Sequence, residues 1–224
     1  DVLARLRLPP ERVRAIPLAH GPEFSPAPGP NDEAVRANYA LPEAYVLYVG
    51  GFDRRKNLSQ LLAGWTWVQS ALGDSYALVL AGKLPPPDGR MFADLPALAR
   101  QLGVADAVRF PGPIAAADLP AVLRGAAAFV YPSRYEGFGL PPLEAMACGV
   151  PVVACNTSSL PEVTGGAAYL LDPDDARALG AALLTVLVNP DVAADLRQRG
   201  LEQASRFSWE RTARETAQAY DDVR

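Results

Sequence analysis

The segment YPSRYEGFGLPPLEAMACG, at 131–149, carries the residues best suited to chemistry. Glu136 precedes a glycine-rich turn, and Glu144 follows eight positions later in a predicted helix. A carboxylate at the start of such a helix can accept two hydrogen bonds from a vicinal diol. Glycines expose the backbone, so we expect open N–H groups at Gly137, Phe138, Gly139 and Leu140. Glu144 could instead face solvent, but its small apolar neighbours Ala145 to Cys148 make that less favourable.

A second candidate is the basic loop GGFDRRKNL at 50–58. Gly50 and Gly51 allow a ligand to approach the backbone closely. Arg54, Arg55 and Lys56 then place three positive charges just before a predicted helix, and anions bind at helix N-termini. The basic cluster taken alone favours a solvated turn, whereas its position at the end of a strand favours a phosphate site.

Three further loops contribute weaker candidates. Gly82 and Lys83 follow another apolar run, although an isolated lysine there is typical of a protein surface. Pro113 and Ile114 lie in a loop without reactive side chains, whose backbone is placed to contact a nucleobase. Glu162, in NTSSLPEVTGG, suits helix capping and ligand binding about equally.

These loops must be positioned by a regular framework, and the sequence alternates strand and helix signals. Buried strands are predicted at 44–50, 77–82, 107–112, 127–132, 150–155 and 168–172, and a short first strand at 12–18. Helices are predicted at 57–70, 91–102, 118–125, 140–148, 174–188, 190–204 and 208–222, with Asn57 and Asp118 as caps. Residues 21–43 form a predicted surface connection with one helical turn near 34–39.

Such an alternation predicts an α/β fold with a doubly wound parallel sheet and right-handed crossovers. Ligands bind such sheets outside the carboxyl ends of the strands. We therefore expect the candidate loops to form one rim, within a single domain that spans 1–224.

Composition excludes several classes of function. The net charge of −4 argues against a nucleic-acid surface, and no apolar run approaches the roughly 20 residues of a membrane span. The single histidine, His20, excludes a His-rich metal site, and no cluster of carboxylates suggests a metal. Cys148 and Cys155 lie among small apolar residues, which favours buried thiols over a disulfide.

Several segments together resemble the carboxyl-terminal, donor-binding domain of GT-B-fold retaining glycosyltransferases of the large family 4. They are VGGFDRRKNL (49–58), VLAGK (79–83), VRFPGPI (108–114), EGFGLPPLEAMACGVPVVA (136–154) and SSLPEVTGGAAYLLDP (158–173). The resemblance implies the Rossmann-like half of a GT-B fold, and a nucleoside diphosphate sugar as donor substrate. It implies no cofactor and no required metal.

The resemblance also implies residue roles. Glu136 would lie near the donor sugar, Glu144 would bind the ribose hydroxyls, and residues 137–140 would hold sugar and phosphate oxygens. Arg55 and Lys56 would stabilise the leaving diphosphate, while the base would lie near 112–114 and Lys83. Many members carry arginine where this chain has Gly51, and Arg55 would supply that charge.

The resemblance further implies a missing partner, an amino-terminal acceptor-binding domain, so we expect an excised donor-binding half. The RKN run is similar to mannosyl- and rhamnosyltransferases of polysaccharide synthesis. We expect a cytoplasmic enzyme that works at the inner membrane surface and transfers a hexosyl unit to a hydroxyl. Two alternatives remain open at this point: a GT-B epimerase or phosphorylase, and a non-catalytic nucleotide-sugar-binding domain.

Overall fold

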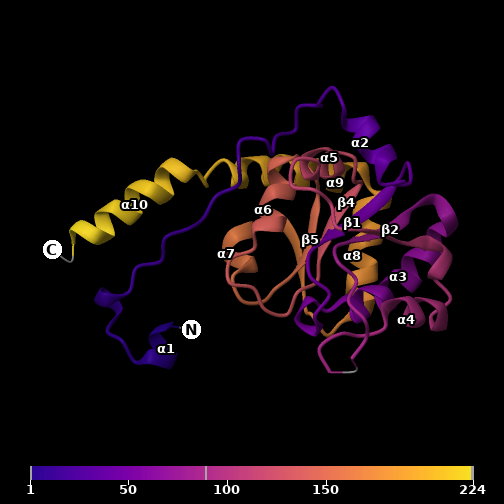
Figure 1. The fold of residues 1–224 in the computed structure, drawn as a ribbon, viewed down its shortest axis with the longest axis horizontal. Coiled ribbons are helices and arrows are strands. Elements are labelled where there is room, and N and C mark those ends of the chain that lie inside the picture. Colours follow the sequence, from indigo (N-terminus) through magenta and orange to yellow (C-terminus); the bar gives the residue numbers. More distant parts are fainter. Residues whose placement is uncertain (1, 89, 223–224) are drawn as a thin grey trace.

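The structure is a computed structural model that describes residues 2–88 and 90–222. At its centre is a six-stranded parallel sheet with strand order β3-β2-β1-β4-β5-β6 (Figure 1). The strands are β1 (Tyr45–Val49), β2 (Ala77–Ala81), β3 (Val108–Gly112), β4 (Ala128–Tyr131), β5 (Val152–Cys155) and β6 (Ala168–Leu171). Their apolar sequences are almost fully buried in the central strands, as expected for a sheet covered on both faces. The predicted fold class and the six strands of the alternating series are confirmed.

Helices cover both faces of the sheet (Figure 1). The α-helices of the described residues are α1 (Val2–Leu6), α2 (Asp32–Asn38), α3 (Leu58–Leu72), α4 (Leu95–Gln101), α5 (Leu119–Arg124), α6 (Leu140–Ala147), α7 (Leu160–Thr164), α8 (Ala176–Val188), α9 (Pro190–Ala204) and α10 (Trp209–Asp221), of which α1 and α10 lie away from the sheet. Helix α3 packs on α8, and α6 packs on α9. Gly64 and Gly180 permit the first contact, because a Cβ on Gly180 would come within 2.5 Å of the Gly64 carbonyl oxygen.

The predicted strand at 12–18 is wrong. Pro10–Arg12 form a short 3₁₀ helix, and the following residues are extended but join no strand within the described residues. An extended segment becomes a strand only when a neighbour accepts and donates its ladder hydrogen bonds. Here the segment runs beside α10, where the hydroxyl of Thr212 donates to the carbonyl of Pro17 at 2.7 Å.

Asn57 and Asp118 stand at the predicted N-cap positions of α3 and α5, but neither side chain makes the expected capping bond. Asn57 has a left-handed backbone (φ 59°), and its side-chain nitrogen donates to the Pro173 carbonyl at 2.7 Å instead of capping α3. Asp118 makes no capping bond and accepts from the Tyr39 hydroxyl at 2.7 Å. The helix predicted from 91 begins at Leu95, because Asp94 caps it by accepting from the Ala97 N–H.

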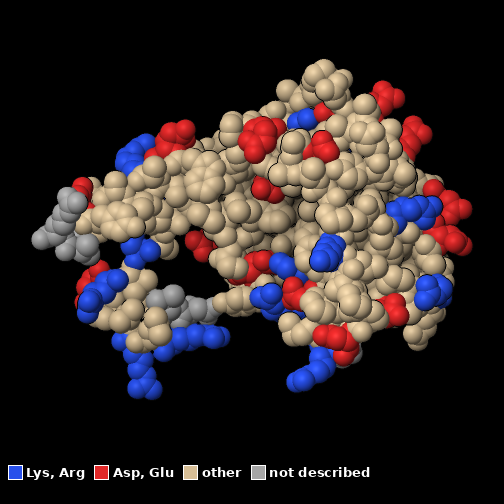
Figure 2. Space-filling model, viewed as in Figure 1, with Lys and Arg blue, Asp and Glu red and all other residues tan. Residues whose placement is uncertain are grey.

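The amino-terminal segment and α10 extend together from one side of the body (Figure 1). Figure 2 shows an opening between them and the body, with basic side chains on the amino-terminal segment. Helix α10 has no buried residue, and Trp209 and Tyr220 are exposed. The hydrophobic core lies in the rest of the chain. Cys148 and Cys155 are buried there as free thiols, as predicted.

Candidate functional site

The rim at the carboxyl ends of the strands is built on three glycines that follow neighbouring strands. The Gly50 N–H donates to the Ala81 carbonyl, and the Gly82 N–H donates to the Gly112 carbonyl at 2.9 Å. A Cβ on Gly82 would come within 2.1 Å of the Gly50 oxygen, so only glycine permits this approach. The loops that begin at Gly50, Gly82 and Gly112 therefore lie side by side, as the sequence indicated.

The basic loop forms a 3₁₀ turn at Arg54–Lys56, capped by Asp53. Asp53 also accepts from the Arg55 guanidinium at 2.8 Å. The Arg55 side chain is 63% exposed, whereas that of Lys56 is only 15% exposed. The two predicted phosphate-binding cations therefore differ: Arg55 is held at the surface by Asp53, and Lys56 faces inward.

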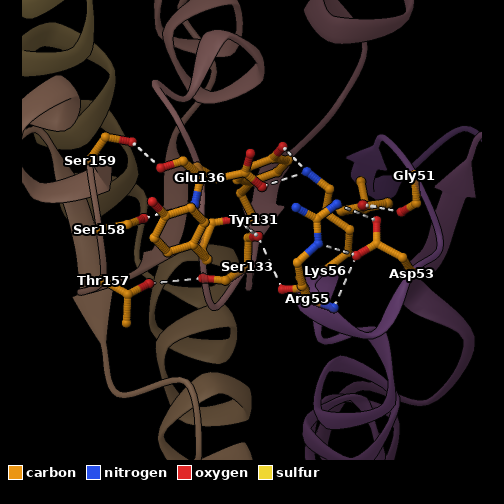
Figure 3. Close-up of polar contacts among 12 residues, drawn as sticks. Gly51, Asp53, Arg55, Lys56, Tyr131, Ser133, Glu136, Thr157, Ser158 and Ser159 are labelled. Carbon is orange, nitrogen blue, oxygen red and sulfur yellow. Dashed lines mark hydrogen bonds and ion pairs between the residues drawn. The ribbon is translucent and has the colours of Figure 1, made fainter. Parts of the chain in front are cut away.

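Lys56 and Glu136, which are 80 positions apart, form an ion pair in which Nζ lies 2.6 Å from Oε1 (Figure 3). Both side chains are largely buried, with 15% and 13% exposed. Screening by solvent is weak in such a position. The structure therefore brings together the two residues that the sequence placed at the diphosphate and at the sugar.

Beneath this ion pair lie two stacked tyrosines, Tyr48 and Tyr131, whose ring centroids are 5.9 Å apart. The Tyr131 hydroxyl lies 3.3 Å from the Lys56 Nζ, and the Tyr48 hydroxyl donates to the Gly51 carbonyl at 2.5 Å. Burial, assisted by the negative charge of Glu136, raises the pKa of Tyr131. Sequence reasoning missed both tyrosines because each lies inside an apolar strand pattern.

The loop that carries Glu136 is fastened on both sides. On one side, the Arg55 carbonyl accepts from the Arg134 N–H at 2.8 Å and from the Ser133 hydroxyl at 3.2 Å. On the other side, the Glu136 N–H donates to the Ser158 hydroxyl at 2.9 Å, and the Ser159 hydroxyl donates to the Glu136 carbonyl (Figure 3). The small polar residues after β5 thus anchor Glu136.

After Glu136 the backbone offers open donors. In the described part of the chain, no hydrogen bond uses the N–H groups of Gly137, Phe138 or Gly139. Gly139 has a φ of 110° and directly precedes α6, whose first turn contains Pro141 and Pro142. The turn therefore presents N–H groups at a helix start, which is an arrangement suited to anions and hydroxyls.

Glu144 lies one turn into α6 and is half-buried. Burial raises its pKa, the charge of Glu23 raises it further, and the charge of His20 lowers it. Its charge also raises the pKa of Tyr131. Glu136 and Glu144 are thus both electrostatically coupled to one buried tyrosine.

The other predicted residues have a less defined setting. Lys83 and Pro113 are exposed, Ile114 is partly buried against the core, and Glu162 is exposed in the first turn of α7. Phe138 packs edge-on against Phe207, at a centroid distance of 6.0 Å. Behind this pair lies a cavity of about 400 Å³ that Glu162 also lines.

Residues 31–203 match the family described as glycosyl transferases group 1. The chain belongs to this family, and its parallel α/β sheet matches that of GT-B glycosyltransferases. The resemblance seen in the sequence is therefore confirmed.

Individual relatives agree. The chain is 35% identical over 221 residues to the O-antigen chain mannosyltransferase B of Escherichia coli, covering 98% of this chain and 57% of that protein. The structure of a sucrose-phosphate synthase from Thermosynechococcus elongatus aligns with a TM-score of 0.76 at 34% identity, over 94% of this chain and 52% of that one. The carboxyl-terminal domain of a group 1 glycosyl transferase from Francisella tularensis aligns with a TM-score of 0.66 at 21% identity. This alignment covers 84% of this chain and 97% of that domain. The chain thus spans about half the length of the mannosyltransferase and of the sucrose-phosphate synthase.

Among the described helices, none is by itself long and apolar enough to cross a membrane; only α8 taken together with residues 190–221, bent by 97°, meets the length and composition requirements.

Proposed function

We propose that this chain is the donor-binding half of a retaining glycosyltransferase that moves a mannosyl-like hexosyl unit from a nucleoside diphosphate sugar to a hydroxyl in polysaccharide synthesis. The observation that carries the proposal is the Lys56–Glu136 pair beside the open N–H groups of 137–139. The mannosyl assignment rests on the relative from Escherichia coli. The retaining outcome rests on the family resemblance.

In this proposal the chain supplies charge and geometry. Lys56 and the N-terminus of α6 stabilise the negative charge that builds up on the leaving diphosphate, because preorganised donors act strongly where water is excluded. Glu136 lies at the sugar, and Glu144 accepts hydrogen bonds from the ribose diol. Arg55 must leave Asp53 or bridge from it to reach the phosphates. No metal or cofactor takes part in this scheme.

The proposed partner is an acceptor-binding domain elsewhere in the full-length enzyme. Helix α10 and the extended segment beside it offer this domain an exposed surface that includes Trp209 and Tyr220. The helix and the segment both lie on the side of the molecule that extends away from the sheet (Figure 1). We also propose that the full-length enzyme works at a cytoplasmic membrane surface.

Calorimetric titration of the chain with GDP and with UDP tests the proposal, and we expect GDP to bind more tightly. Glu144→Ala should weaken that binding, because the ribose hydroxyls lose their acceptor. If neither nucleotide binds at millimolar concentration, and Glu144→Ala has no effect in the full-length enzyme either, the donor site is elsewhere.

A further inference from the structure

We infer that the buried hydroxyl of Tyr131 is a positioning group that holds the Lys56 ammonium and the Glu136 carboxylate in a fixed relation beneath the donor. The inference rests on the proposed function. It assigns a role to a residue that lies at the end of β4, below the rim rather than on it.

Packing alone does not require a hydroxyl at this position. Phe129 lies two residues earlier on the same face of β4, and its ring stacks on Tyr131 at 6.0 Å. Tyr131 is 2% exposed and Phe129 is 0% exposed, so phenylalanine would fill the same layer. Burying a hydroxyl without a partner destabilises a fold, so the Tyr131 hydroxyl needs the polar groups above it.

Those groups are the two charges of the candidate site. The Lys56 ammonium donates to the Tyr131 oxygen, at 3.3 Å, and to the Glu136 Oε1, at 2.6 Å. The same lysine lies 5.5 Å from the centre of the tyrosine ring, within the range of a cation–π contact. The tyrosine therefore restricts the ammonium directly, and it restricts Glu136 through that ammonium (Figure 3).

This arrangement has a consequence for the bound donor. A diphosphate attracts Lys56 and so competes with Glu136 for the ammonium. The Tyr131 hydroxyl and ring hold the ammonium at the rim before the diphosphate arrives. The lysine side chain therefore needs less ordering on binding, which lowers the free-energy cost of forming the complex.

Tyr131→Phe tests the inference, with Tyr45→Phe as the matched control. Tyr45 is equally buried, and its hydroxyl donates to the Val122 carbonyl at 2.6 Å, at the opposite end of the sheet. In calorimetry, Tyr131→Phe should raise the GDP dissociation constant about fivefold to tenfold, as expected for loss of a hydrogen bond to a charged group. Guanosine binding should stay within twofold, and Tyr45→Phe should change neither constant.

A second measurement does not depend on nucleotide. In urea unfolding, the effects of Tyr131→Phe and Lys56→Met on the unfolding equilibrium constant should depart from additivity by about fivefold in the double variant. The effects of Tyr45→Phe and Lys56→Met should be additive. Additivity of the first pair overturns the inference, whatever the binding data show.

The binding data separate the remaining outcomes. Unchanged GDP affinity in Tyr131→Phe, with tight binding by the unmodified chain, overturns the positioning role and leaves the proposed function standing. Loss of GDP and guanosine binding together would also overturn it, because that pattern indicates a general distortion. No GDP or UDP binding by the unmodified chain or by the full-length enzyme removes the proposed function and this inference with it.

Discussion

Replacing Lys56 by alanine should weaken GDP binding about 30-fold to 100-fold and leave guanosine binding within twofold. The reason is that Lys56 is the inward-facing cation of the basic loop, with 15% of its side chain exposed. A nucleoside lacks the phosphates that this cation would meet. The prediction therefore separates a phosphate-binding role from a general role in the fold.

The magnitude follows from the geometry. Two unit charges about 4 Å apart attract by about 4 kcal/mol at an effective dielectric constant of about 20. Lys56 already interacts with Glu136 at 2.6 Å, so part of this attraction is given up when the diphosphate binds. A net loss of about 2–3 kcal/mol remains, and about 1.4 kcal/mol corresponds to a factor of ten in affinity.

The assay is calorimetric titration with GDP, and ligand-observed NMR for the weaker guanosine complex. Arg109→Ala is the matched control, because it removes an exposed positive charge near the amino end of β3, away from the rim. We expect it to change GDP affinity less than threefold. Adding Glu136→Gln to Lys56→Ala should restore several-fold of the affinity, since an unpaired carboxylate then no longer repels the phosphates.

Three results would refute this reasoning about Lys56. The first is an equal loss of GDP and guanosine affinity, which indicates a disturbed fold. The second is an equal loss in Lys56→Ala and Arg109→Ala, which indicates a non-specific charge effect. The third is unchanged GDP binding, which places the diphosphate elsewhere on the rim.

Two further predictions concern stability. Burial raises the pKa of Glu144 above its ordinary value of 4.5, so its contribution to stability is largest below that value and is lost as the pH rises through the raised pKa. Glu144→Gln should therefore stabilise the chain at pH 7 by on the order of 0.5–1 kcal/mol, measured by urea unfolding. At pH 4 the substitution should bring no gain in stability. Destabilisation at pH 7 would contradict this prediction. Asp32 forms a two-pronged pair with Arg124, at 2.7 Å for both bonds, which lowers the pKa of Asp32. The contribution of Asp32 to stability is present above its ordinary pKa of 3.8 and is lost as the pH falls through its lowered pKa. Asp32→Asn should therefore destabilise the chain by about 1–2 kcal/mol at pH 7 and by less in acid. It should leave GDP affinity unchanged.

The sequence predicted the sheet because its strands are short apolar runs that end in glycine or small polar residues. Such runs identify strands buried on both faces. A parallel arrangement then places all of their carboxyl ends at one edge, which makes the rim predictable as well. This reasoning needs only local patterns and one rule of topology, so it was correct for β1 to β6 without any knowledge of contacts.

The contacts within the rim were not predictable in the same way. Lys56 and Glu136 lie in different loops, and their pairing depends on how two loops fold over neighbouring strands. Tyr131 is indistinguishable in the sequence from any other apolar residue of β4. Its significance arises only because its hydroxyl reaches the Lys56 ammonium above it. Asn57 shows the same limit, since its left-handed backbone turns the side chain toward Pro173 and away from the helix that it precedes.

The segment 12–18 and helix α10 show the opposite case, in which a local pattern is present but its expected burial is not. The apolar residues of 12–18 suit a strand, yet within the described residues no strand lies beside them. Helix α10 places Trp209 and Tyr220 eleven positions apart, or three helical turns, on one face that stays exposed. A strand and an amphipathic helix are both stabilised mainly by what covers them. The two segments contact each other through Thr212 and Pro17, so a single surface that covered one would readily extend over the other.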